Sequence, residues 1–235
     1  MILKPPKGAM LNRGHPLARG LAGLWLMNES GGNIVNDLSG NGITGTLQGT
    51  ASLVPCKYGS GLSSLNSGEY IDLGSPSQLD LLGDHTILAW IKTSHTGCVG
   101  IYNKLTDGGS YTGLTFQLNG TVGVAGQMTY YSGGVGTWRV ANSIGIDDGN
   151  WHQVAVVVDH DSGGTFYLDG KPDGGWSGSS EGALYDASNA ELGRNYEDIQ
   201  MYGFMDHAMI WNRTFSASEI FYLYRSPFCM FEVDL

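Results

Sequence analysis

Charged side chains are scarce in this sequence, at 14% of 235 residues, and Lys and Arg number only 12 against 22 Asp and Glu. The formal charge of −10 disfavours nucleic acid and anionic membranes as partners, because an acidic surface repels both. No apolar run approaches the ~20 residues of a membrane span, and none near the start has the length of a signal peptide's apolar region. We therefore expect no nucleic-acid partner and no membrane insertion.

Cysteine is also rare. Cys56, Cys98 and Cys229 are widely spaced and form no Cys-x-x-Cys pair, so the sequence indicates neither a zinc site nor a disulfide framework. We expect buried free thiols, with one disulfide and a left-over thiol as the alternative.

Glycine is plentiful instead, with 37 residues, and aromatic residues make up 11% of the chain. Many short apolar runs stand between Gly, Ser, Asn and Asp, which is typical of an all-β protein with frequent turns. No Pro-rich, Ser-rich or charged linker divides the chain, so we expect one core.

Two neighbouring segments carry the clearest strand pattern. In residues 148–159 (DGNWHQVAVVVD) every position from 154 to 158 is apolar, which predicts a central strand buried on both faces. Residues 165–171 (TFYLDGK) alternate until Asp169-Gly170, a pair that suits a tight hairpin turn.

The ordered set DG-x-WH-x-VA-x-x-x-D followed by YLDGK resembles the signature of laminin-G-like domains in the concanavalin A-like lectin and glucanase superfamily. Further segments similar to that family, in its order, are 23–29, 36–47, 70–74, 86–93 and 203–213. The resemblance covers about residue 23 to 224 and implies an all-β jelly-roll sandwich of two antiparallel sheets. This architecture hosts glycan-binding modules, glycosidases, adhesion domains and structural subunits, so it implies fold better than activity.

We expect three parts along the chain. Residues 1–20 form an extended N-terminal arm, because their prolines and glycines disfavour regular structure. Residues 21–226 form the sandwich and end in a short helix, for which Ser216 is the N-cap and Glu219 completes a capping box. Residues 227–235 are an apolar tail. The opening at 11–29 (LNRGHPLARGL-x-GLWL-x-NE) is similar to laminin-G-like proteins of bacterial viruses and environmental bacteria, which favours a virion or extracellular surface as the setting.

Catalysis is not indicated. Glycoside hydrolases need two carboxylates about 5–9 Å apart, and the laminarinase-type run Glu-x-Asp-x-x-Glu that supplies them in this superfamily is missing. The six histidines show no metalloenzyme spacing, and neither Gly-x-Ser-x-Gly nor a phosphate-loop lysine occurs. We expect a protein that is not an enzyme.

A calcium site is the metal prediction. The loop from Asp37 to Gly42 is rich in Asp, Asn and Gly, whose oxygens suit Ca²⁺. The resemblance implies that this loop meets an acidic residue on the penultimate strand, which Asp206 matches, whereas His207 replaces the second acidic residue. We therefore expect Asp37, Asn41 and Asp206 to hold structural Ca²⁺; the alternative is that Asn and Asp only make turns.

Aromatic residues outside the strand motifs suggest a sugar platform. Trp176 and Trp138 lie in Gly-rich polar contexts, whereas Trp25, Trp90, Trp151 and Trp211 fall in strand motifs and should be core. We expect the ligand-binding residues to be Trp176, Trp138, Tyr130, Tyr131 and Tyr111.

These features predict a non-catalytic binding or adhesion module for carbohydrate. The alternative is a structural subunit that associates with further copies of itself, in which the same aromatic rings would seal a contact between copies.

Overall fold

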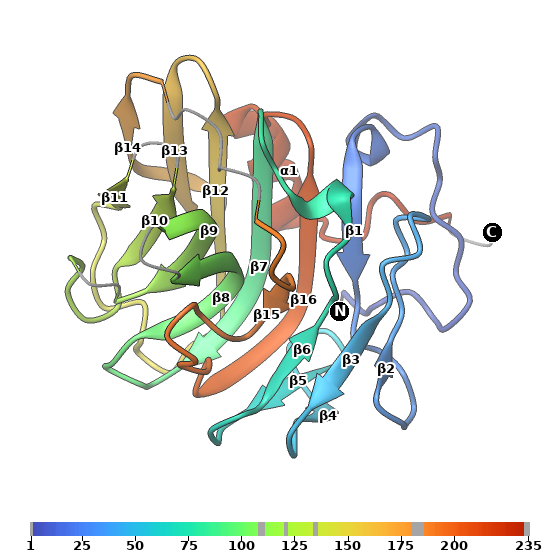
Figure 1. Cartoon of the computed structure of the whole chain (residues 1–235). Helices are drawn as coiled ribbons and strands as arrows, with labels where there is room; N and C mark the ends of the chain where they lie inside the picture. The colour runs from blue at the N-terminus through green and yellow to red at the C-terminus, as the bar shows by residue number, and fades with distance from the viewer. Residues whose placement is uncertain (1, 108–110, 120–121, 134–135, 180–185, 233–235) are drawn as a thin grey trace.

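The computed structural model describes residues 2–107, 111–119, 122–133, 136–179 and 186–232. Two eight-stranded sheets lie face to face, and every strand pair in the described part of the chain is antiparallel (Figure 1). The predicted jelly-roll sandwich is confirmed.

The first sheet has, in spatial order, β14 (Lys171–Ser177), β13 (Gly163–Leu168), β12 (His152–Asp159), β7 (His85–Thr93), β16 (Gly203–Trp211), β5 (Ser60–Ser64) and β4 (Ser52–Pro55), with β1 (Leu21–Trp25) also paired to β16. The second sheet has, in order, β11 (Thr137–Val140), β10 (Met128–Ser132), β9 (Tyr111–Leu118), β8 (Val99–Asp107), β15 (Glu191–Leu192), β6 (Tyr70–Asp72), β3 (Gly45–Gln48) and β2 (Ile34–Val35). The helical elements are η1 (Pro16–Ala18), η2 (Ser77–Leu79) and α1 (Ala217–Arg225).

Strand β12 is buried on both faces, as its sequence predicts. Val154, Val156 and Val158 pack in the main core between the sheets, whereas Ala155 and Val157 belong to a second apolar cluster on the outer face of the first sheet. That outer face is covered by helix α1, by part of the N-terminal arm and by the C-terminal segment. The first sheet therefore has no free face at its centre.

The expected hairpin turn is also confirmed. Strands β13 and β14 pair Leu168 with Lys171, which leaves Asp169 and Gly170 as a two-residue turn. Their φ angles of 49° and 78° are both left-handed, as a type I′ turn requires.

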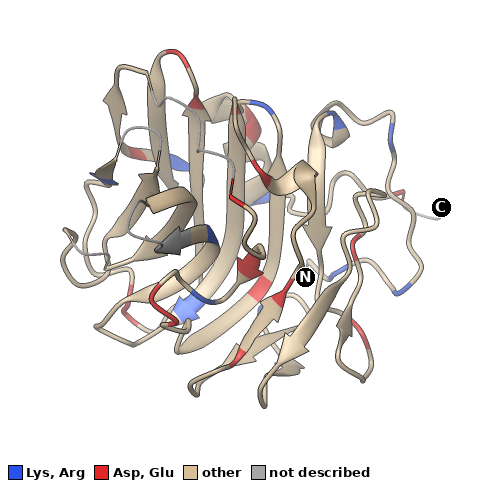
Figure 2. Cartoon of the chain, viewed as in Figure 1, with Lys and Arg blue, Asp and Glu red and all other residues tan. Residues whose placement is uncertain are grey.

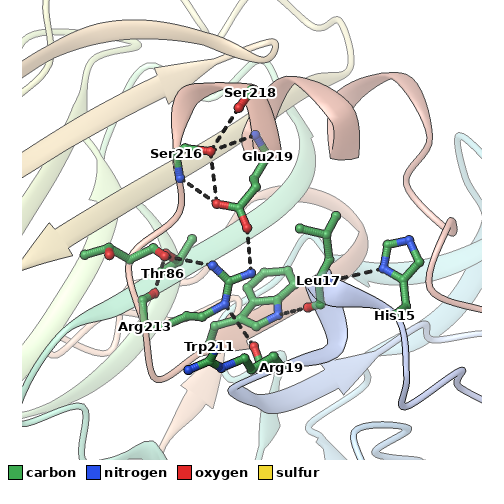
Figure 3. Close-up of polar contacts among 10 residues, drawn as sticks. His15, Leu17, Arg19, Thr86, Trp211, Arg213, Ser216, Ser218 and Glu219 are labelled. Atoms are coloured by element: carbon green, nitrogen blue, oxygen red, sulfur yellow. Dashed lines mark hydrogen bonds and ion pairs between the residues drawn. The ribbon is translucent and has the colours of Figure 1, made fainter.

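The arm and α1 are fixed to the first sheet around Arg213 (Figure 3). The Trp211 indole nitrogen donates to the Leu17 carbonyl at 2.7 Å, and Arg213 donates to the Arg19 carbonyl and to the Glu219 carboxylate, each at 2.9 Å. Ser216 and Glu219 form the predicted capping box at the start of α1. The arm differs from its prediction in one respect, because Pro16–Ala18 forms a short 3₁₀ turn capped by His15.

The N-terminal arm lies beside the C-terminal segment. Asn12 N donates to Met230 O at 2.8 Å, Glu232 N donates to Met10 O at 3.0 Å, and Leu11 and Phe231 form an isolated β-bridge between these two contacts. Phe231 is buried, so the apolar tail packs on its own chain as far as residue 232, and residues 233–235 lie outside the described residues. The boundaries at 20/21 and 226/227 stay predictions.

Cys56, Cys98 and Cys229 are free, so the disulfide alternative is wrong, and each thiol is only partly buried. No helix in the described ranges is long and apolar enough to cross a membrane.

Candidate functional site

One row of side chains runs across the outer face of the second sheet. Directly paired residues of antiparallel strands share a face, so the strand register places the following residues side by side: Trp138, Tyr131, Thr115, Asn103, Glu191 and Asp72. The row begins with aromatic rings on β11 and β10 and ends with carboxylates on β15 and β6. It places aromatic rings and polar groups on one sheet face, but its middle is covered, since Tyr131, Thr115 and Asn103 are 6%, 0% and 4% exposed.

The aromatic end of the row is a cluster of four rings, Tyr111, Tyr131, Trp138 and Tyr196, which we call the aromatic cluster. The ring centroids are 5.1 Å apart for Tyr131 and Trp138, 5.6 Å for Tyr111 and Tyr131, 5.5 Å for Tyr111 and Tyr196, and 6.1 Å for Trp138 and Tyr196. The space enclosed among the rings is only about 10 Å³, so a ligand would lie on the cluster rather than inside it. Tyr111 is 42% exposed and offers the most accessible ring face.

A groove of about 290 Å³ adjoins the aromatic cluster; Tyr196 belongs to both, and Leu105 lines both the groove and the small space among the rings. We call it the polar groove; its lining residues are Asn103, Leu105, Ser188, Asn189, Glu191, Arg194, Asn195, Tyr196 and Asp198. Groove and cluster together have the composition of a site for a polyhydroxylated ligand, with ring faces beside hydrogen-bonding groups.

The segment after β15 holds the two parts of the site together. Asn195 is fully buried, and its side-chain nitrogen donates to Gln117 Oε1 on β9 at 3.1 Å, while its oxygen accepts from Ile199 N at 2.9 Å. Gly100 on β8 permits this close approach, since a Cβ atom there would lie 2.2 Å from the backbone of Arg194. The neighbours of Asn195 in sequence, Arg194 and Tyr196, are thereby placed in the groove and the cluster.

Electrostatics in the polar groove centre on Glu191. Burial raises the pKa of Glu191 to about 7, although Arg194 and a hydrogen bond from the Asn103 side chain act in the opposite direction. Arg194 Nη1 lies 3.5 Å from Glu191 Oε1, and the same guanidinium also pairs with Asp198. At the end of the row, the Asn189 amide donates to both oxygens of Asp72, at 3.0 and 3.1 Å.

Three of the five aromatic residues expected from the sequence, Trp138, Tyr131 and Tyr111, meet in the aromatic cluster. The other two do not. Tyr130 is 1% exposed, because it alternates with Tyr131 along β10 and points into the core. Trp176 is only half-buried, but its ring packs inward, stacked on Tyr130 with centroids 5.6 Å apart and planes at 13°. Gly164 is paired with Trp176 on the neighbouring strand, and the absence of a Cβ atom there makes room for the Trp176 ring. The sequence around Trp176 therefore shows glycines rather than periodic apolar residues, although the ring packs inward.

Tyr196, Glu191 and Arg194 were not among the predicted ligand residues. Tyr196 resembles other aromatic residues in polar loops, and Glu191 and Arg194 stand in a stretch without strand periodicity. Only the pairing of the two-residue strand β15 with β8 and β6 places Glu191 in the row.

The residues predicted to hold calcium are not brought into one set. Asp37 accepts hydrogen bonds from the backbone nitrogens of Leu24, Ser39 and Ile43, and the Asn41 amide donates to the carbonyls of Leu21 and Ala22. Asp206 instead pairs with Lys4 and accepts from Tyr58 N at 2.9 Å. Within the described ranges no group of three or more His, Cys, Asp or Glu side chains could hold a metal ion. The three residues therefore do not fit a shared calcium site.

Fold and site together define a jelly-roll sandwich with a candidate ligand groove on one sheet. The chain belongs to the concanavalin A-like lectin/glucanases superfamily, because the Laminin_G_3 family model described by that name matches residues 65–221. No curated protein matches the sequence closely enough to count as a relative.

Solved structures share the fold at low identity. The binding domain of Paraclostridial Mosquitocidal Protein 1 has a TM-score of 0.70 and 16% identity over 91% of this chain and 53% of that one. The binding domain of botulinum neurotoxin DC in complex with SialylT has a TM-score of 0.67 and 12% identity over 89% and 52%. A Trypanosoma rangeli sialidase in complex with sialic acid has a TM-score of 0.66 and 17% identity over 90% and 33%. The chain spans about half the length of the two toxin domains and a third of the sialidase.

Proposed function

We propose that this protein is a non-catalytic carbohydrate-binding module, and that a glycan lies across the aromatic cluster and the polar groove. The observation that carries the proposal is that the aromatic cluster adjoins the polar groove through Tyr196, so that ring faces stand beside hydrogen-bonding side chains. Sugar rings present an apolar face that stacks on aromatic side chains and a rim of hydroxyl groups that need polar partners. The similarity to toxin binding domains supports a binding role for the fold.

A glycan array with purified protein tests this function. Tyr111→Ala and Trp138→Ala should each lower glycan affinity by about tenfold or more, since aromatic anchors carry a large share of binding energy. Tyr222→Ala is the matched control for Tyr111→Ala, because Tyr222 lies on α1 and is 48% exposed against 42%. Equal affinities for wild type, both cluster variants and the control would reject the aromatic cluster as the binding surface.

Self-association through the same rings is the alternative. In that case Trp138→Ala would lower the mass in solution, and the melting temperature of the wild type would rise with protein concentration, as mass action requires of an oligomer. Light scattering on wild type and Trp138→Ala, run beside the array, separates the two functions.

Hydrolysis of the bound glycan has one observation in its favour. Glu191 and Asp72 are directly paired across β15 and β6, and paired residues have Cβ atoms about 4.5–5.5 Å apart, which is near the separation that a retaining glycosidase uses. Both carboxylates already have partners, however, because Arg194 pairs with Glu191 and Asn189 with Asp72. We therefore favour binding; release of reducing sugar by the wild type and its loss in Glu191→Gln would decide for hydrolysis.

A further inference from the structure

The polar groove carries more acidic than basic side chains. Glu191 and Asp198 line it, and Asp72 stands beside Glu191 in the row. Among its described lining residues Arg194 is the only Lys or Arg, in a chain where basic residues are few and spread over separate elements (Figure 2).

Both Nη atoms of Arg194 face carboxylates, and its Nε atom is buried without a hydrogen-bond partner. Its guanidinium pairs with Asp198 and lies 3.5 Å from Glu191 Oε1, and its carbon lies 4.3 Å from the centroid of the Tyr70 ring. Two carboxylates thus face one cation, and at a pH above the Glu191 pKa of about 7 the lining keeps an excess of negative charge. A carboxylate or sulfate in the groove would meet like charge close to buried groups, where Coulomb repulsion is weakly screened.

Asn103 supplies a second and independent indication. It is 4% exposed, its side-chain nitrogen faces Glu191, and its Oδ1 atom is buried without a hydrogen-bond partner. A buried acceptor without a partner is costly, and a ligand hydroxyl relieves that cost once the Asn103 side chain shifts towards the groove. Glu191 on the neighbouring strand is a second acceptor; its side chain is 12% exposed and lies 3.5 Å from Arg194 Nη1.

We propose that the polar groove selects uncharged glycans whose hydroxyl groups donate hydrogen bonds to Asn103 and Glu191, and that it rejects sialylated and sulfated glycans. This inference rests on the proposed function and specifies the chemical class of its ligand. The aromatic cluster provides the stacking surface, and the groove provides the discrimination by charge.

The test is run above the Glu191 pKa of about 7, so that this carboxylate is ionised, and uses pairs of oligosaccharides that differ only in a terminal sialic acid or a sulfate. Wild type should bind the uncharged member of each pair about tenfold or more tightly, because like charges placed together in a site are strongly unfavourable. Asp198→Asn should reduce that preference, since it leaves Arg194 with one carboxylate partner fewer. Asp198 is 75% exposed on its side chain, so this variant should fold normally.

Glu197→Gln is the matched control. It removes one negative charge from the adjacent exposed position, but Glu197 neither lines the groove nor pairs with Arg194. The ratio of affinities for uncharged and sialylated partners should therefore stay within about twofold of wild type, as expected of a screened surface charge. An equal change in both variants would assign the preference to overall charge and overturn the role of the Arg194 pair.

The outcomes separate the two proposals. If wild type binds sialylated or sulfated glycans as tightly as their uncharged partners, the inference is wrong and the glycan-binding function stands. If no glycan of either kind binds, the proposed function fails and the inference fails with it.

Discussion

Lys4 Nζ lies 3.0 Å from Asp206 Oδ1, and the two side chains are 3% and 0% exposed. The ammonium group also donates to the carbonyls of Ser60 and Asp206, so the N-terminal arm is fixed to β16 and β5 by one buried cation. Although burial alone would raise it, contacts with His207 and Lys4 hold the pKa of Asp206 below its usual value.

Loss of Lys4 should destabilise the fold. Lys4→Met would leave the Asp206 carboxylate buried without its cationic partner, which typically lowers the unfolding free energy by about 3–5 kcal/mol. Lys7→Met, an exposed position of the same arm, should change it by less than about 0.5 kcal/mol. Urea unfolding of both variants checks this, and equal stability of the two would show that Lys4 contributes no buried ion pair.

Glu69 should make the protein sensitive to acid. Burial opposes the shift, but hydrogen bonds from Asn66, Thr50 and Leu65 lower the pKa of Glu69 to about 2. A depressed pKa contributes stability that is present above the unfolded value near 4.5 and is lost as pH falls towards 2, here about 3 kcal/mol. Stability measured from pH 6 to pH 2 should fall less steeply in Glu69→Gln than in wild type or in Glu197→Gln. Parallel curves for all three proteins would contradict the shift.

Trp176 and Trp138 should behave differently when truncated. Trp176→Ala removes a ring that stacks on Tyr130 and packs against Phe166 in the core, so we expect a loss of about 3–5 kcal/mol. Trp138→Ala removes a ring of the outer aromatic cluster and should cost clearly less stability while weakening glycan binding. Denaturant unfolding of the two variants compares their free energies of unfolding. A larger loss of stability in Trp138→Ala than in Trp176→Ala would contradict this assignment.

Calcium provides a direct test of the metal site expected from the sequence. Since Asp206 is paired with Lys4 and the Asp37 carboxylate accepts backbone hydrogens, we expect metal-stripped protein to melt at the same temperature with and without added Ca²⁺. A sample with a calcium chelator serves as the control. A calcium-dependent rise in melting temperature that Asp206→Ala removes would restore the predicted site.

The sequence was sufficient for elements whose pattern is local. The double burial of β12, the Asp169-Gly170 turn and the capping box of Ser216 and Glu219 follow from spacing, side-chain polarity and backbone freedom within one segment. The polar contexts of Tyr111, Tyr131 and Trp138 indicated rings that the fold brings together, although Tyr131 is only 6% exposed and a ligand role for the three stays a prediction.

The rest of the site depends on pairing between distant segments. Tyr130 and Tyr131 are adjacent, and only the register of β10 decides which ring faces the core. The strand β15 has two residues, too few for any periodicity, yet its pairing places Glu191 between Asn103 and Asp72. The prediction for Asp206 did not account for Lys4. Nothing in residues 1–20 indicates that this lysine is buried against Asp206, which follows it by 202 positions in the sequence.

The β-bridge between Leu11 and Phe231 joins two segments that lie near opposite ends of the sequence. Both ends of a chain normally fray unless they are tied down, and here residues 10–12 and 230–232 tie each other down. A protease that trims residues near 230 would uncover the backbone of Met10 and Asn12, and removal of the arm would uncover the tail in turn. Resistance to digestion at either end is thus a joint property of both.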